Sequence, residues 1–404
     1  MGSAIPGELL LDPAIIENPY PFYRRLVAEA PVWQAGDTDI FAVSSYARLT
    51  EAAGRVEDFS SNLRYLLYRD ERGLPARESH GLPDVQILAT VDPPVHAAHR
   101  KIVAAAFSPN RLAALETIIA GLAVRLVNEA LPQGEIDFMA AVANLIPIEI
   151  VSALVGFKDA DAGALQQAAF ASTDILAGAI SRETLRARTS FSTETGLWIA
   201  QQLESAIGER RDGVIGELAE AVRSTAIEPI VAIAILHILL SAGGESTTSL
   251  IGNAVRILAE DGGLQQKLRE NPALIPSFVE EVLRLEAPFR HHMRWASHAT
   301  TLGGVHIPAG ATVLFLWGAA NRDPEKFERP DELILDRLRR HVTFGSGIHT
   351  CLGNTLARLE ARVVIQVLLQ LTRDIAIDAR RPARRVSSLA VRRYEDLPLV
   401  LRAN

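Results

Sequence analysis

The feature that most constrains the fold is a long helical segment that begins at Pro229 and can continue to Glu260. Proline suits the first turn of a helix, where its missing N–H is not needed. The stretch from Pro229 to Leu240 is apolar on every side, which predicts a helix through the centre of the molecule. This stretch has about 12 residues, whereas a membrane-spanning helix needs about 20. We therefore expect a core helix and no membrane span, and Met1–Glu8 shows no secretory signal.

Helical periodicity dominates the rest of the chain, and the strand-like runs are short. We expect helices within 18–30, 95–285 and 352–372, and strands within 39–43, 301–313 and 387–401. Residues 60–90 and 320–350 are irregular and charged, which predicts long loops. The sequence shows no repeat and no linker. The fold class is therefore mainly α with small β-sheets (α+β), as one domain over residues 1–404 with a loosely ordered 1–17.

Composition and charge exclude several classes of protein. Apolar residues make up 48% of the chain, which excludes a disordered protein. The net charge of −7 argues against a nucleic-acid partner or an anionic membrane surface. The single cysteine, Cys351, excludes an internal disulfide, a four-thiolate zinc site and an iron–sulfur cluster, and it fits a cytoplasmic protein. A lone cysteine is more often a buried filler than a reactive group.

The segment around Cys351 favours the reactive alternative. Gly345 and Gly347 allow a tight turn and a close approach to a flat partner. An apolar helix follows from Leu352, so the cysteine lies at a helix N-terminus, where N–H groups and the helix dipole lower the pKa of a thiol. A thiolate in this position is an axial ligand for haem iron. A dinucleotide-binding glycine loop is a poor alternative, because the third glycine and the βαβ context are missing.

The same segment resembles the haem-ligand signature of the cytochrome P450 family, Phe-x-x-Gly-x-His/Arg-x-Cys-x-Gly. Phe344, Gly347, His349, Cys351 and Gly353 stand at the required offsets. The resemblance extends over residues 18–401 and is greatest to the soluble bacterial members. It implies the cytochrome P450 fold, with a long central helix over the haem and the cysteine loop beneath it, and Cys351 as the ligand to the iron.

Glu281 and Arg284 form a Glu-x-x-Arg pair on a helix. Alone, such a pair is most often a solvated ion pair. The resemblance implies that both join Arg337, in the irregular stretch, in a buried network that holds the scaffold on the haem side.

Four residues, one of them in the signature, match the family's donors to the haem propionates. These are His96 and Arg100, four residues apart on one helix face, Arg294, and His349. Taken alone, His96 is more often a plain surface histidine. Arginine forks and histidine N–H groups are the donors that carboxylates require.

The long helix carries an unusual polar group, Ala242-Gly243-Gly244-Glu245-Ser246-Thr247. The plain interpretation is a helix that becomes amphipathic here. The resemblance implies that Ala242 and Gly243 contact the haem, where the glycines let the helix open locally. It also implies that Glu245, Ser246 and Thr247 deliver protons to the oxygen. Ser246 stands where the family usually has threonine, so the hydroxyl lacks the methyl group that fixes its rotamer.

The resemblance places substrate-pocket residues at Leu239, Phe289 and Arg290. His291 and His292 follow in a segment that passes the haem. Adjacent side chains point apart and no third ligand is evident, so we do not expect a metal site there.

The function implied is a haem-thiolate monooxygenase that inserts one atom of O2 into an apolar substrate, with haem b as its cofactor. Electrons would come from a ferredoxin and a ferredoxin reductase. A positive docking face for the ferredoxin would be formed by Arg337, Arg339, Arg340, Arg358 and Arg362. Two alternatives stay open: a peroxygenase that uses peroxide, and a haem-binding sensor or carrier without turnover. The acid–hydroxyl pair speaks against both.

Overall fold

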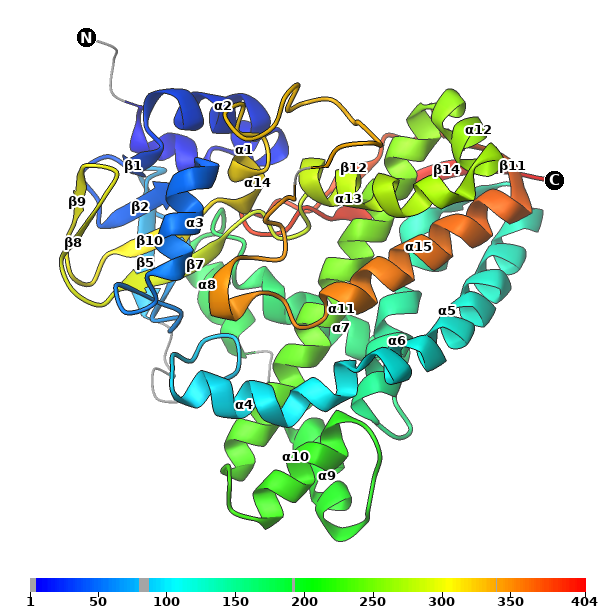
Figure 1. Cartoon of the computed structure of the whole chain (residues 1–404), viewed down its shortest axis with the longest axis horizontal. Coiled ribbons are helices and arrows are strands. Elements are labelled where there is room, and N and C mark those ends of the chain that lie inside the picture. The colour runs from blue at the N-terminus through cyan, green and yellow to red at the C-terminus, as the bar shows by residue number, and fades with distance from the viewer. Residues whose placement is uncertain (1–4, 80–86, 191–192, 339) are drawn as a thin grey trace.

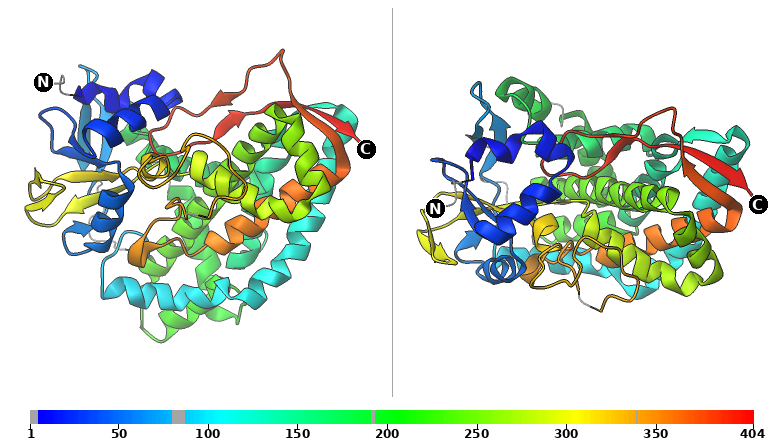
Figure 2. Two further views of the ribbon diagram at one scale, coloured as in Figure 1. Left: turned by 45° about the horizontal axis from the view of Figure 1, so that its top comes forward. Right: turned by 90° about the horizontal axis from the view of Figure 1, so that it is seen from above.

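The central helix, α11 (Pro229–Glu260), has the bounds that the sequence predicts. The computed structural model describes residues 5–79, 87–190, 193–338 and 340–404. Seen from above, α11 runs between two layers of helices (Figure 2). One layer contains α5 (Pro109–Ala130), α13 (Ile275–Leu285) and α15 (Asn354–Leu371), and the other contains α6 (Leu145–Val155) and α7 (Ala162–Asp174). Leu250, Ile251 and Val255 on α11 join the main apolar core formed with both layers.

By length and composition, α11 is the one helix among the described residues that could cross a membrane. In this fold it packs against α6, α7 and α15, and its residues from Thr247 to Val255 are all buried inside the protein. This placement agrees with the expected core helix.

The remaining helices surround this core or cover the sheets (Figure 1). They are α1 (Pro13–Glu17), α2 (Tyr20–Glu29), α3 (Tyr46–Gly54), α4 (Val95–Ala104), α8 (Arg182–Ser190), α9 (Thr193–Gly208), α10 (Val214–Arg223), α12 (Gly262–Glu270) and α14 (Trp317–Ala320). Short 3-10 turns cover Gly7–Leu11, Ala105–Phe107, Leu131–Gln133, Pro272–Leu274 and Gly347–His349, and Met139–Ala143 is a π-helical turn.

The main sheet has five strands and lies at the N-terminal side of the molecule, at the left of Figure 1. Its order is β1 (Val32–Gln34), β2 (Ile40–Val43), β10 (Thr312–Phe315), β7 (His292–Ala296) and β3 (Phe59–Ser60). β2 and β10 are parallel, and the other neighbours are antiparallel. Both strands of the parallel pair are buried throughout, which explains their continuous apolar runs.

A three-stranded sheet and three two-stranded ribbons complete the β structure. The three-stranded sheet has the order β11 (Thr372–Ile377), β14 (Pro398–Ala403) and β6 (Glu135–Asp137). The ribbons pair β4 (Tyr65–Arg69) with β5 (Pro75–Ser79), β8 (Thr300–Leu302) with β9 (Val305–Ile307), and β12 (Arg384–Arg385) with β13 (Tyr394–Asp396).

Two local expectations are wrong where the structure describes them. The region 60–90 is not a plain loop, because β4 and β5 form a hairpin; residues 80–86 lie outside the described residues. The N-terminal segment is not loose from residue 5 onward. The side chain of Asp12 caps α1 by accepting hydrogen bonds from two backbone N–H groups, and Leu10 and Leu11 are buried.

Candidate functional site

The loop that carries Cys351 is shaped by its two glycines. Gly345 and Gly347 both have φ of +77°, a conformation that favours glycine. A Cβ on Gly347 would lie 2.9 Å from the carbonyl oxygen of Ala53 on α3, so glycine also permits close packing. The backbone N–H of Cys351 donates to the carbonyl of Phe344 at 2.8 Å, which closes the loop. The loop thereby holds Cys351 just before the N-terminus of α15.

The Cys351 side chain is accessible only because it faces a large internal cavity between the loop and α11. Burial raises the pKa of the thiol, and the N–H of Gly353 and the charges of Arg100 and Arg358 oppose this effect. The N–H group at the helix N-terminus thus lowers the pKa as expected, but in the free thiol burial outweighs this contribution. A positive ion at the sulfur would favour the thiolate instead.

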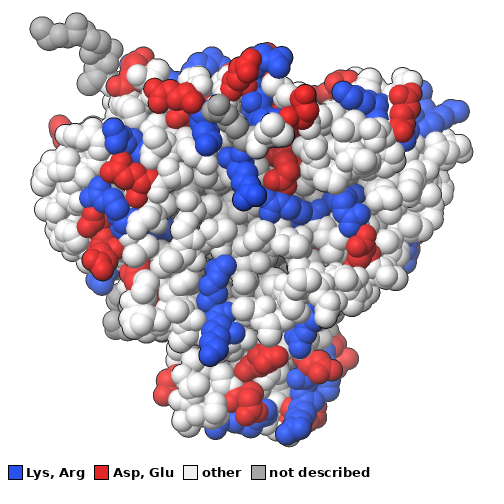
Figure 3. Space-filling model, in the orientation of Figure 1, with Lys and Arg blue, Asp and Glu red and all other residues white. Residues whose placement is uncertain are grey.

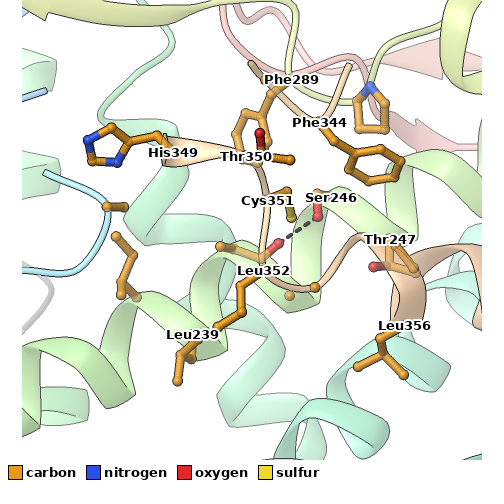
Figure 4. A pocket seen from close by; sticks show the side chains of 18 of the residues that line it. Leu239, Ser246, Thr247, Phe289, Phe344, His349, Thr350, Cys351, Leu352 and Leu356 are labelled. Atoms are coloured by element: carbon orange, nitrogen blue, oxygen red, sulfur yellow. Dashed lines mark hydrogen bonds between the residues drawn. The ribbon is translucent and has the colours of Figure 1, made fainter. Parts of the chain in front are cut away.

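Most of the sequence-predicted site residues meet at this cavity. Figure 4 shows Cys351 and Phe344 from the cysteine loop and Ser246 and Thr247 from α11 around the same space. The predicted residues that line the cavity are His96, Arg100, Leu239, Ala242, Gly243, Ser246, Thr247, Phe289, Arg294, Phe344, His349, Cys351 and Gly353. Those that do not line it are Glu245, Glu281, Arg284, Arg290 and Arg337.

Four donor side chains gather at one end of this cavity. The rings of His96 on α4 and His349 in the cysteine loop lie 4.2 Å apart between centroids. Burial, followed by the charges of Arg294, His96 and Arg100, lowers the pKa of His349 to about 3. Burial also lowers the pKa of Arg294 to about 10. Basic groups that repel one another in this way form a site for an anion.

The donors also have unused hydrogen-bonding capacity. Nε2 of His349 is buried without a partner, and the guanidinium of Arg294 donates only to the carbonyl of the adjacent Met293 in the described structure. A haem carries two carboxylates and an iron, which match these donors and the Cys351 sulfur. The residues present therefore fit a haem. No group of three or more His, Cys, Asp or Glu side chains in the described parts of the chain forms a separate metal site.

The polar segment of α11 forms the opposite wall. The helix continues without interruption through this segment, and the hydroxyl of Ser246 donates to the carbonyl of Ala242 at 2.6 Å. A Cβ on Gly244 would lie 2.7 Å from Cδ1 of Ile148, so this glycine lets α6 pack closely. Close packing is thus one reason for the glycine pair, whereas the local opening of the helix that the resemblance implies is not seen in the described structure.

Glu245 points away from the cavity, unlike Ser246. Its carboxylate accepts a hydrogen bond from Nε of Arg393 at 2.9 Å, and both side chains are buried. The second oxygen, Oε2, has no partner in the described structure. Burial raises the pKa of Glu245 to about 7, although Arg393 opposes the shift. The sequence gives no sign of this partner.

The structure brings Glu281, Arg284 and Arg337 together in a buried cluster. Arg284 binds both carboxylate oxygens of Glu281, at 2.7 and 2.9 Å, and Nε of Arg337 lies 3.1 Å from the same carboxylate. Burial opposes ionisation of Glu281, but these donors and the N–H of Ile334 outweigh it and hold the pKa below its usual range. Arg284 also donates to the carbonyls of Pro330 and Glu332. The cluster thereby fastens the irregular stretch to α13.

Arg290 is not a pocket residue, and this prediction is wrong. Its guanidinium is buried and donates to the carbonyl of Ile16 at 2.7 Å, which ties the N-terminal segment to the core. The direction of this side chain depends on a partner far away in the sequence.

Glu360 on α15 is a cavity residue that the sequence analysis missed. It is 2% exposed, and Oε2 has no hydrogen-bond partner in the described structure. Burial raises its pKa to about 8, so the carboxyl group is neutral near pH 7. The burial of Glu360 could have been predicted from its spacing on the helix. Glu360 follows the buried Leu356 by one turn and precedes the buried Val364 by another, so all three lie on the buried face.

The mainly α fold, the cysteine facing a cavity and the anion-binding donors define a haem-thiolate type of protein. The model of the cytochrome P450 family matches residues 232–373. The chain is 39% identical to cytochrome P450 144 of Mycobacterium tuberculosis, over 96% of this chain and 89% of that protein. The chain belongs to the cytochrome P450 family, whose members are haem-thiolate monooxygenases.

Two further relatives extend the comparison. The beta-dihydromenaquinone-9 omega-hydroxylase of Mycobacterium tuberculosis is 33% identical over 89% of this chain and 71% of that protein. The crystal structure of P450BioI in complex with hexadec-9Z-enoic acid ligated acyl carrier protein has a TM-score of 0.86. It is 26% identical and covers 96% of this chain and 100% of that chain.

Proposed function

We propose that the protein binds haem b through the Cys351 thiolate and inserts one atom of O2 into an apolar small molecule. The observation that carries this proposal is the meeting of the one cysteine and four carboxylate donors at a single cavity. When bound, the haem supplies the activation of O2, and the cysteine thiolate favours O–O cleavage.

His96, Arg100, Arg294 and His349 would hold the two propionates, while the backbone around Cys351 presents the sulfur. The negative charges of the propionates would offset the positive charge of the donors and relieve the repulsion among them. The local charge distribution therefore favours haem binding. The Glu281–Arg284–Arg337 cluster keeps the preceding stretch in place, and this role is positional.

The α11 residues would deliver protons. Oγ of Ser246 already donates to the carbonyl of Ala242, so its lone pairs are free to accept a hydrogen bond from water in the cavity, and it would pass on its own proton as it takes one from that water. The carboxyl group of Glu245, with a pKa of about 7, can both take up and release a proton near neutral pH. Its route to Ser246 requires a turn of the side chain away from Arg393. Thr247 supplies a second hydroxyl at the cavity.

Electrons would come from a separate ferredoxin and ferredoxin reductase, because one cysteine cannot hold an iron–sulfur cluster. The predicted docking face is smaller than the sequence suggests. Arg337 is in the buried cluster, Arg358 pairs with Glu280 at 2.6 Å, and Arg362 pairs with Glu116 at 2.7 Å.

Arg340 is exposed, and Arg339 lies outside the described residues. Basic side chains nevertheless lie across the middle of the face that carries α15, among a few acidic ones (Figure 3). We expect reduction by an acidic ferredoxin to slow as ionic strength rises. A rate that is independent of salt would contradict this docking mode.

The substrate class follows from the apolar wall, to which Val151, Leu154, Ile238, Leu239 and Phe289 contribute. One relative is named as a hydroxylase of an isoprenoid quinone, and one structural neighbour holds a fatty acyl chain. We propose a lipid-like substrate and a cytoplasmic location for the reaction.

A spectral titration of the ferric protein with fatty acids, isoprenoid quinones, steroids and small aromatic compounds tests the substrate class. Lipid-like members should shift the spin state and support NAD(P)H-dependent product formation in the presence of redox partners. Product formed with peroxide alone, and none with the redox partners, would favour the peroxygenase. Ligand binding without turnover by either route would favour a sensor or carrier.

A further inference from the structure

His292 lies beside the donor cluster, in the segment that the resemblance places past the haem, where it shapes the substrate pocket. It is the first residue of β7, and Arg294 is two residues later on the same strand face, because alternate side chains of a strand point the same way. Both side chains line the cavity. Met293, between them, packs against the N-terminal core on the other face. His292 thus faces the same space as Arg294.

Trp317 fixes the tautomer of this histidine. The indole Nε1 of Trp317, on α14, lies 2.7 Å from Nδ1 of His292, and the indole side chain is 1% exposed. An indole N–H can only donate, so Nδ1 of His292 must be the unprotonated acceptor. Burial, followed by the charges of Arg294, His291 and His349, lowers the pKa of His292 to about 3. The ring is therefore neutral and carries its one proton on Nε2.

This Nε2–H group is a donor without a protein acceptor. In the part of the chain that the structure describes, no hydrogen bond is formed by Nε2, and the His292 side chain is accessible from the cavity. The ring is held on two sides, by Trp317 and by Phe289, whose ring centroid is 5.5 Å away. The Nε2–H group therefore has a fixed direction and faces the cavity next to Arg294 and His349, where a ligand that fills the cavity and excludes water would have to supply an acceptor oxygen.

We infer that His292 is a fifth hydrogen-bond donor for a haem carboxylate, held by Trp317 in the tautomer that places its proton on Nε2. The inference rests on the proposed function, since the carboxylate belongs to the haem. A neutral donor adds a hydrogen bond without adding another positive charge to a cluster that already repels itself. Trp317 is a positioning residue, because it acts through His292. An oxygen of the substrate is the competing acceptor.

The test measures the rate of haem transfer from the holoprotein to an excess of apomyoglobin. A hydrogen bond to a charged group has a free energy that corresponds to roughly tenfold or more in rate, so His292→Phe should release haem about tenfold faster. His292→Gln, whose amide nitrogen can replace Nε2, should stay near the wild-type rate. His306→Phe, at an exposed histidine of β9, is the matched control and should not change it.

Trp317→Phe keeps a ring but removes the indole N–H, and it provides a second readout. Nitrogen-15 NMR of the reduced, carbon-monoxide-bound protein should show one His292 tautomer in the wild type and a mixture in this variant. The haem should also be released faster from the variant. This measurement decides the question if His292→Phe does not fold.

Wild-type haem release in both His292→Phe and Trp317→Phe would overturn the inference. Weaker substrate binding by His292→Phe, with haem release unchanged, would assign the donor to the substrate and also overturn it. The proposed function fails separately, by loss of the red-shifted reduced carbon-monoxide band in the wild-type protein.

Discussion

Glu360 should make the stability of the protein fall as pH rises through the neutral range. The unfolded chain releases the proton of this carboxyl group near pH 4.5, whereas burial raises the folded-state pKa to about 8. Between these values the folded state binds more protons than the unfolded state. Stability contributed by the protonated group is therefore greatest below pH 4.5 and is lost as pH rises toward 8.

The two pKa values set the size of the effect. One pKa unit corresponds to about 1.4 kcal/mol. Compared with a carboxyl group whose pKa does not change on folding, Glu360 therefore lowers the free energy of unfolding by about 3 kcal/mol at pH 7 and by about 1 kcal/mol at pH 5. For a chain of 404 residues, a difference of about 2.5 kcal/mol between these pH values corresponds to about 3 °C in Tm. Glu360→Gln keeps the shape of the side chain and removes the titration.

The assay is thermal unfolding of the holoprotein by circular dichroism at pH 5, 6, 7 and 8. The Tm of Glu360→Gln minus the Tm of the wild type should increase by about 3 °C from pH 5 to pH 7. Glu325→Gln, which removes an exposed carboxylate, serves as the control and should show no such gain. A difference between Glu360→Gln and wild type that is the same at every pH would refute the reasoning.

Three other perturbations test two buried ion pairs and the Ser246 hydroxyl at the cavity. Arg393→Leu leaves Glu245 without its counter-charge and should lower the free energy of unfolding, measured in urea, by about 3–5 kcal/mol. Adding Glu245→Leu should restore part of this free energy, and no recovery in the double variant would contradict the pairing. Glu281→Gln leaves Arg284 and its partner arginine without a carboxylate and should lower the urea midpoint and speed haem loss, whereas an unchanged midpoint would show that the cluster does not stabilise the fold. Ser246→Thr adds the methyl group that restricts the rotamer and should raise the product formed per NAD(P)H consumed; equal coupling would refute a role for rotamer freedom.

The long helix and the cysteine loop could be predicted because their signals are local. Pro229 marks a helix start, and the apolar run after it requires burial, so the bounds of α11 follow from the sequence. Gly345 and Gly347 indicate a tight turn by themselves, and both adopt the left-handed conformation. The hairpin of β4 and β5 was missed because its charged residues resemble a loop.

Side-chain direction could not be predicted where the partner lies far away in the sequence. Glu245 turns toward Arg393, 148 residues later, and Arg290 turns toward the carbonyl of Ile16, 274 residues earlier. Helix α11 and the segment before β7 put these residues near the cavity, but the distant partner decides which way each side chain points. Glu360 shows the converse case, since its helical phase gives burial but not the lack of a partner.

The most direct test of the account is the absorption spectrum of the reduced protein under carbon monoxide. A thiolate ligand from Cys351 predicts a strongly red-shifted Soret band in the wild type and its loss in Cys351→Ala. A wild-type protein that binds haem without this shift, or a Cys351→Ala variant that retains it, would contradict the haem-thiolate assignment.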